Sequence, residues 1–195
     1  MSSDPTTTPV SPEVERQVDS ADSTLHNPRS AVVALGSNLG NRLDTLQGAI
    51  DALEDTPGVR IKSVSAVFET EGVGGPENQP NYFNAVLVLR TTLPPHSLLE
   101  RANAVEDAFG RVREVRWGAR TLDVDILAYE GVELDAPELT LPHPRAHERA
   151  FVLAPWLDAD PDAEIPGHGS VADLLRRVGE EGVQRRKDVS LHLPE

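Results

Sequence analysis

Apolar residues recur along this chain with two different periods, which together predict alternating strands and helices. Ala31–Leu35 is a short unbroken apolar run, which is typical of a buried strand. From Leu43 to Leu53 the apolar positions recur every three or four residues, as on one face of a helix. Pro57-Gly58 ends that helix. The Gly36–Gly40 segment between them lacks the Gly-Lys-Ser/Thr ending of a phosphate loop, so we interpret it as a tight strand-to-helix turn.

The next apolar segments predict two more strands and a second helix. Val59–Thr70 reads as one strand with Val64, Ala66 and Phe68 on a common face. Asn81–Leu89 alternates as a further strand, and residues 94–110 follow as a proline-opened, glycine-closed helix.

A last strand begins at residue 121, and its side chains alternate in character. Leu122, Val124 and Ile126 share one face and are expected in a core, which places Asp123 and Asp125 together on the other. Two adjacent carboxylates repel each other unless a cation lies between them. We therefore expect these aspartates to bind a hard metal ion through oxygen.

The order strand, helix, strand, strand, helix, strand predicts an α+β, ferredoxin-like fold: an antiparallel sheet with helices packed on one face. Residues 147–158 and Val171–Val178 have the apolar spacing of helices, so a C-terminal helical extension follows. From Gly179 onward the charges are mixed, and we expect this tail to fray.

A cationic segment lies immediately before the aspartate strand. Residues 111–120 contain four arginines and one glutamate, net +3, in a chain of net charge −14. Arginines clamp phosphate oxygens, so the loop and the aspartates together suit a polyphosphate that carries Mg²⁺. Taken alone, either feature is as well explained by a solvated loop or a solvated sheet face.

Two other polar groups leave their interpretation open. Tyr82 and Asn84 share a strand face, where they could stack on a planar ring and hydrogen-bond its edge, although strand statistics alone favour ordinary packing for Tyr82. His143 and His147 lie four residues apart, but Pro144 opposes a continuous helix and no carboxylate or thiol supports zinc. A phosphate contact suits His143 and Arg149 better.

Composition narrows the class of protein. The chain has 195 residues, no cysteine and a pI of about 4.8. We expect a cytoplasmic protein without a membrane span, whose acidity opposes nucleic acid as its main partner. Residues 1–29 have the composition of a disordered leader, and residues 30–195 are expected to form a single domain.

Four motifs, in order, resemble one family: Ala34-Leu-Gly-Ser-Asn-Leu39, Gln79-Pro-Asn-Tyr-Phe-Asn-Ala85, Arg116-Trp-Gly-Ala-Arg-Thr-Leu-Asp-Val-Asp-Ile126, and Leu141-Pro-His143 with Glu148-Arg-Ala-Phe151. The chain is similar to the 6-hydroxymethyl-7,8-dihydropterin pyrophosphokinases from about Ala31 to about Ile165. The resemblance implies a diphosphotransferase of folate biosynthesis. Its partners would be ATP as co-substrate and 6-hydroxymethyl-7,8-dihydropterin, bound by an expected monomer.

The resemblance also implies roles for individual residues. Asp123 and Asp125 would bind two Mg²⁺ ions, and Arg111, Arg113 and Arg120 would act on the phosphates. ATP would contact Asn103, Glu106, Arg116, Trp117, Arg120, Ile126, Thr140, His143 and Arg149. The pterin would contact Thr70, Val73, Tyr82, Asn84, Trp117 and Phe151. The family often has glutamine at the position of Asn103, and proline where this chain has Glu71.

Two functions of other classes are alternatives to this one. A ferredoxin-like RNA-binding module would present Tyr82 and Phe83 as stacking residues on an open sheet, but it predicts a basic protein. A noncatalytic nucleotide-binding domain would not need two adjacent metal-binding carboxylates. A lack of turnover in a protein with intact Asp123 and Asp125 would favour this noncatalytic domain over an enzyme.

Overall fold

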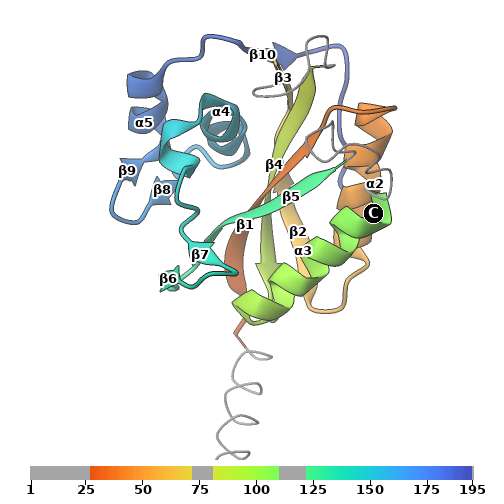
Figure 1. Ribbon diagram of the computed structural model, residues 1–195, viewed down its shortest axis with the longest axis vertical. Helices are drawn as coiled ribbons and strands as arrows, with labels where there is room; N and C mark the ends of the chain where they lie inside the picture. The colour runs from red at the N-terminus through yellow and green to blue at the C-terminus, as the bar shows by residue number, and fades with distance from the viewer. Residues whose placement is uncertain (1–26, 72–80, 110–121, 195) are drawn as a thin grey trace, which may run out of the picture.

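The computed structural model describes residues 27–71, 81–109 and 122–194. At its centre is an antiparallel sheet in the order β10-β3-β4-β1-β5, with β2 also paired to β4 (Figure 1). The strands are β1 (Arg29–Ser37), β2 (Val59–Val64), β3 (Val67–Thr70), β4 (Tyr82–Thr91), β5 (Asp123–Tyr129) and β10 (Val183–Arg186). The sheet confirms the α+β, ferredoxin-like plan expected from the order of elements.

Helices cover both faces of this sheet. On one face lie α2 (Arg42–Glu54) and α3 (Pro95–Phe109), and on the other lie α4 (Ala150–Ala159) and α5 (Val171–Val178) (Figure 1). The expectation that helices pack on one face of the sheet is therefore correct for α2 and α3 only. The C-terminal helical extension is confirmed, and it folds back over the opposite face.

Strand alternation explains how one sheet supplies two cores. In β4, Phe83, Ala85 and Leu87 pack toward α2 and α3, whereas Val86 packs toward α4 and α5. Phe83 is thus a core residue, 5% exposed, and cannot stack on RNA. Both sheet faces are covered, which argues against the RNA-binding alternative.

The first helix forms as its pattern predicts. The side chain of Asn41 accepts a hydrogen bond from the Asp44 backbone N–H at 3.1 Å and so caps α2. Leu46, Ala49 and Ile50 form part of its buried face. The preceding strand is longer than expected, because β1 continues through Gly36 to Ser37, and the turn therefore begins only at Asn38.

The expected strand Val59–Thr70 is in fact two strands, and this expectation was wrong. The interruption at Ser65–Ala66 is held by Ser65, whose hydroxyl accepts from the Val86 N–H at 2.9 Å, and by Asp158, which accepts from the Ala66 N–H at 2.7 Å. The break changes which face of the sheet the following side chains point to. Val64 packs with the α2–α3 core, whereas Phe68 packs with the α4–α5 core.

The expected fraying after Gly179 was also wrong. Residues 183–186 form β10, which pairs antiparallel with all four residues of β3. Beyond it, Val189 and Leu191 pack against the α2–α3 core. The mixed-charge sequence did not predict this strand, because the residues of β3 with which it pairs lie more than a hundred residues earlier in the chain.

Short elements complete the fold. The β6 (Leu134–Asp135) and β7 (Thr140–Leu141) strands form one ribbon, and β8 (Glu164–Ile165) and β9 (Gly169–Ser170) form another. The helix expected over residues 147–158 is divided into a single 3₁₀ turn, η1 (Ala146–Glu148), and α4. Within the described ranges, no helix has the length and apolar character needed to cross a membrane.

Candidate active site

A pocket of about 450 Å³ opens where the ends of β1, β3, β4 and β5 meet the segment that leads into α4. Its walls combine acidic, basic and aromatic side chains. It is lined by Ala34, Leu35, Gly36, Thr70, Glu71, Tyr82, Asn84, Ala85, Asp123, Asp125, Leu127, His143, Arg145, Arg149, Phe151 and Val152.

Asp123 and Asp125 form the acidic wall of this pocket. Their strand, β5, pairs with β1 so that Asp123 lies opposite Gly36 and Asp125 opposite Ala34. Leu122, Val124 and Ile126 pack in the α2–α3 core, which confirms that both aspartates point the other way, into the pocket. The start of β5 is fixed by α3, because Glu106 accepts a hydrogen bond from the Val124 N–H at 3.1 Å.

A basic wall faces the aspartates. His143 is held by its backbone N–H, which donates to the Leu127 carbonyl at 2.8 Å, and Arg149 precedes the first residue of α4. Burial and the charges of Arg149 and Arg145 lower the pKa of His143, and the charge of Asp125 only partly offsets them. His143 Nδ1 lies 3.2 Å from the Arg145 N–H and accepts from it. In the neutral ring the proton is then on Nε2, which becomes a hydrogen-bond donor.

Aromatic and amide groups form the other end of the pocket. The Asn84 amide nitrogen donates to the Thr70 hydroxyl at 2.8 Å, and both side chains are buried. Tyr82 lies two residues before Asn84, on the same face of β4. Phe151 approaches from the first turn of α4, with the Arg149 guanidinium 5.5 Å from its ring centre. This end can hold a flat ring by its faces and recognise its polar edge by hydrogen bonds.

Eight of the residues expected from the sequence meet in this pocket: Thr70, Tyr82, Asn84, Asp123, Asp125, His143, Arg149 and Phe151. Four others lie outside its lining. Glu106 supports β5 from behind, and Ile126 packs its side chain in the core. Thr140 is in β7, and Asn103 is exposed on α3.

The remaining expected site residues lie outside the described ranges. They are Val73, Arg111, Arg113, Arg116, Trp117 and Arg120. Their assignments stay predictions.

Gly36 and Arg145 line the pocket but had not been assigned to it. A Cβ at Gly36 would lie 3.3 Å from the Asn84 Oδ1 atom and 3.7 Å from Tyr82 Cδ1, so the missing side chain lets β1 approach these two residues. Glycine inside a strand is a known sign of close approach, but an expected turn at this position obscured it. The proximity of Arg145 to His143 and Arg149 in sequence was the only signal for its location.

The fold and pocket define a class of protein: one that brings a phosphate-rich ligand and a planar ring together. The carboxylates and the basic wall suit a polyphosphate with a divalent cation, and the aromatic end lies in the same cavity. Residues 32–161 match the family described as 7,8-dihydro-6-hydroxymethylpterin-pyrophosphokinase (HPPK), so the chain belongs to that family.

Similar proteins agree with this assignment. The chain is 42% identical over 155 residues to the 2-amino-4-hydroxy-6-hydroxymethyldihydropteridine pyrophosphokinase of Methylorubrum extorquens, covering 80% of this chain and 97% of that one. It is 42% identical over 173 residues to the Mycobacterium bovis protein of the same name, covering 84% and 89%.

A solved structure, wild-type HPPK-DHPS of Plasmodium falciparum with pteroate, has a similar fold with a TM-score of 0.62 at 14% identity. The match covers 82% of this chain, which spans about half, 48%, of the Plasmodium chain.

Proposed function

We propose that this protein transfers the pyrophosphate group of ATP to 6-hydroxymethyl-7,8-dihydropterin, giving AMP and the pterin diphosphate for folate biosynthesis. Family membership supports the reaction. The observation that carries it to this chain is the shared pocket, which Asp123 and Asp125 line from β5 and Tyr82 and Asn84 line from β4, on the two sides of β1. Transfer between two substrates needs their reacting atoms in one cavity, and this cavity offers both kinds of wall.

Asp123 and Asp125 would hold the metal that accompanies ATP. They fit a hard cation because both offer carboxylate oxygens from one strand face and open into a cavity with room for phosphate and water. We expect two Mg²⁺ ions, which when bound neutralise phosphate charge in the transition state. The role of β5 is to hold the two carboxylates in register, with Glu106 fixing the strand through the Val124 N–H.

His143 and Arg149 would bind phosphate oxygens. Arg149 offers a permanent positive charge and a planar set of donors. Burial, with the charges of Arg149 and Arg145, lowers the pKa of His143, and the Nε2–H of its neutral ring would donate a hydrogen bond to a phosphate oxygen. Arg111, Arg113, Arg116 and Arg120 are proposed to contribute further charge.

Tyr82 and Phe151 would stack on the pterin, and Asn84 would hydrogen-bond its edge. The Thr70 hydroxyl fixes the orientation of the Asn84 amide. With the ring held there, the hydroxymethyl oxygen would attack the β-phosphorus of ATP in line: the new oxygen–phosphorus bond forms, and the bond to the AMP oxygen breaks. The chain contributes mainly by positioning and by charge stabilisation, as is usual in phosphoryl-type transfer.

Further expectations accompany this proposal. We expect a monomeric, cytoplasmic enzyme that acts on small molecules rather than nucleic acid. Residues from about 30 onward would form its single domain, and residues 1–26 lie outside the described part of the chain.

An assay of AMP release tests the function directly. Purified protein is incubated with ATP, Mg²⁺ and 6-hydroxymethyl-7,8-dihydropterin, and the nucleotides are separated by ion-pair chromatography. AMP should form in equal amount to the pterin diphosphate, and 6-methyl-7,8-dihydropterin, which lacks the attacking hydroxyl, should give none. Formation of ADP, or equal AMP with the methyl analogue, would contradict the proposal.

A further inference from the structure

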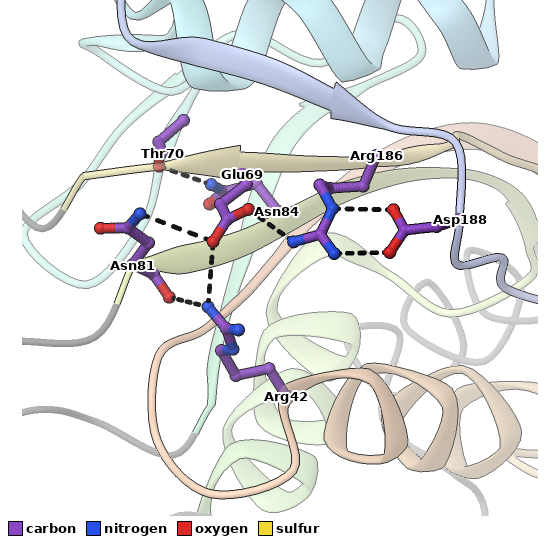
Figure 2. Close-up of polar contacts among 7 residues, drawn as sticks. All are labelled: Arg42, Glu69, Thr70, Asn81, Asn84, Arg186 and Asp188. Carbon is purple, nitrogen blue, oxygen red and sulfur yellow. Dashed lines mark hydrogen bonds and ion pairs between the residues drawn. The ribbon is translucent and has the colours of Figure 1, made fainter.

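The C-terminal strand brings an arginine to the edge of the sheet, where it joins a group of polar side chains. Arg186 donates to Glu69 at 2.6 Å and to both carboxylate oxygens of Asp188 at 2.8 Å and 2.6 Å (Figure 2). Arg42, the first residue of α2, lies 3.5 Å from the other Glu69 oxygen and donates to the Asn81 carbonyl at 2.6 Å. We call these five residues the Glu69 cluster.

The cluster lies directly behind the ring-binding end of the pocket. Glu69 pairs with Phe83 across β3 and β4, and the next pair is Thr70 with Tyr82. Because side chains alternate, Glu69 points toward α2, whereas Thr70 points into the pocket, where it bonds Asn84 (Figure 2). Glu69 and Asn81 thus immediately precede the two pocket residues Thr70 and Tyr82.

An aromatic ring joins the cluster to the strand that carries Tyr82. The guanidinium of Arg42 lies 3.9 Å from the centre of the Phe83 ring, and that of Arg186 lies 5.4 Å from it. Glu69 balances the two cations that contact this ring. Removal of the carboxylate would break the ion pairs with Arg42 and Arg186 beside the first residues of β4, and Arg186 would keep only its pair with Asp188.

The charges of the cluster are partly shielded from water. The side chains of Glu69, Arg42 and Arg186 are 18%, 25% and 26% exposed. Partial burial alone would raise the pKa of Glu69, but the hydrogen bond from Arg186 and the charges of Arg186 and Arg42 outweigh it and lower that pKa. The cluster is therefore a set of coupled ionic contacts and not a loose surface pair.

The rest of the C-terminal segment fixes Arg186 in place. On the opposite face, Arg185 contacts Asp158 of α4 at 2.9 Å. Further on, His192 and Gln47 of α2 exchange two hydrogen bonds, each of 2.9 Å. The strand β10 is thus attached to the helical layer on each face, which gives Glu69 a rigid partner.

We propose that Glu69 is a positioning residue for the pterin end of the pocket, and that the C-terminal strand acts through it. Held by Arg186 and Arg42, Glu69 keeps the end of β3 and the start of β4 in the spacing that presents Thr70, Tyr82 and Asn84. The inference rests on the proposed function, because it takes these three residues as the pterin site. Asp123 and Asp125 are held by β1 and α3 and do not depend on the cluster.

Glu69→Gln tests this role, since glutamine keeps the shape and removes the charge. Pterin affinity is measured by calorimetry with an unreactive ATP analogue and Mg²⁺ present, and the affinity for the ATP analogue is measured separately. We expect the pterin Kd to rise by roughly threefold to tenfold and the analogue Kd to stay within about twofold. Asp173→Asn is the matched control, because it breaks an exposed pair with Arg176 on α5 and should change neither value.

Three further variants make the test specific. Arg186→Gln should weaken pterin binding as Glu69→Gln does, and Arg186→Lys should weaken it less. The double variant Glu69→Gln/Arg186→Gln should bind pterin no more weakly than the single variant with the higher pterin Kd. Hydrogen exchange should quicken at residues 82–84 and stay constant at residues 123–126. An unchanged pterin Kd, equal loss for both ligands, or additive losses would overturn the inference.

Tyr82→Ala separates this inference from the proposed function. If Tyr82→Ala weakens pterin binding but Glu69→Gln does not, the site is correct and the positioning role is wrong. If neither variant affects pterin while AMP is still released, the pterin site itself is misplaced, and the positioning role fails with it.

Discussion

The two ends of the pocket differ in how far apart their residues lie along the chain. The phosphate end takes Asp123, Asp125, His143 and Arg149 from one continuous stretch, which runs from the first residue of β5 to the residue before α4. The pterin end takes Thr70, Tyr82 and Asn84 from two earlier strands, and Phe151 from α4. The strand β3 that carries Thr70 is paired in turn with β10, which lies more than a hundred residues later in the chain. Local patterns can therefore reveal the phosphate end, whereas the pterin end depends on long-range packing.

The largest effect should come from the phosphate end. Asp123→Ala and Asp125→Ala should each lower turnover by at least about a hundredfold, ~2.7 kcal/mol of barrier, because each removes a carboxylate that holds the metal. The AMP-release assay measures the loss, and circular dichroism should show an unchanged fold. Turnover within about tenfold of wild type in both variants would refute the metal assignment.

Tyr82→Ala should be the largest effect at the pterin end. Loss of a stacking face should cost about 1 kcal/mol of pterin binding, or roughly fivefold in Kd, with little change for an unreactive ATP analogue. Calorimetry gives both constants, and Tyr129→Phe is an aromatic control outside the pocket, because the hydroxyl that it removes donates to the Leu93 carbonyl beside the α2–α3 core. Equal weakening of both ligands would show that the two ends are not separable.

Gly36→Ala probes the strand that runs between the two ends. Gly36 pairs with Asn84 on one side and with Asp123 on the other, but among the described residues the added methyl would be crowded by the Asn84 Oδ1 atom, at 3.3 Å, and not by Asp123. We expect a pterin Kd about two to three times higher at nearly constant turnover under saturation. A large fall in turnover with unchanged pterin affinity would place the effect at Asp123 instead.

The residues of the phosphate end could be placed from the sequence more fully than the strands around the pterin end, and the reasons are physical. Strict alternation in Leu122–Ile126 is enough to place Asp123 and Asp125 on one face, since β geometry leaves no other arrangement. The same rule failed for Val59–Thr70, because the Ser65 hydroxyl and the Asp158 carboxylate satisfy backbone groups at a break that no local pattern announces. β10 was missed because Arg185 and Arg186 are stabilised by carboxylates on distant elements.

A smaller effect should appear in acid. The pKa of Glu69 is held below its ordinary value of 4.5, despite partial burial, by Arg186 and Arg42, and the hydrogen bond from Arg186 lowers that of Asp188 to about 2. As the pH falls, these two carboxylates bind protons in the unfolded chain at a higher pH than in the folded one. Both groups therefore stabilise the fold at neutral pH and lose that contribution in acid. As the pH falls below about 4.5, the Tm of wild type should fall more than that of Glu69→Gln. Parallel curves would mean that the Glu69 cluster contributes no pH-dependent stability.

The most direct test of a pocket with two distinct ends is a crystal structure with an unreactive ATP analogue, Mn²⁺ in place of Mg²⁺, and 6-hydroxymethyl-7,8-dihydropterin. Anomalous scattering locates the metal independently of the protein. We predict metal at Asp123 and Asp125, the pterin between Tyr82 and Phe151, and its hydroxymethyl oxygen directed at the β-phosphorus. Metal bound away from these aspartates, or a pterin outside the Tyr82–Asn84 end, would contradict the account.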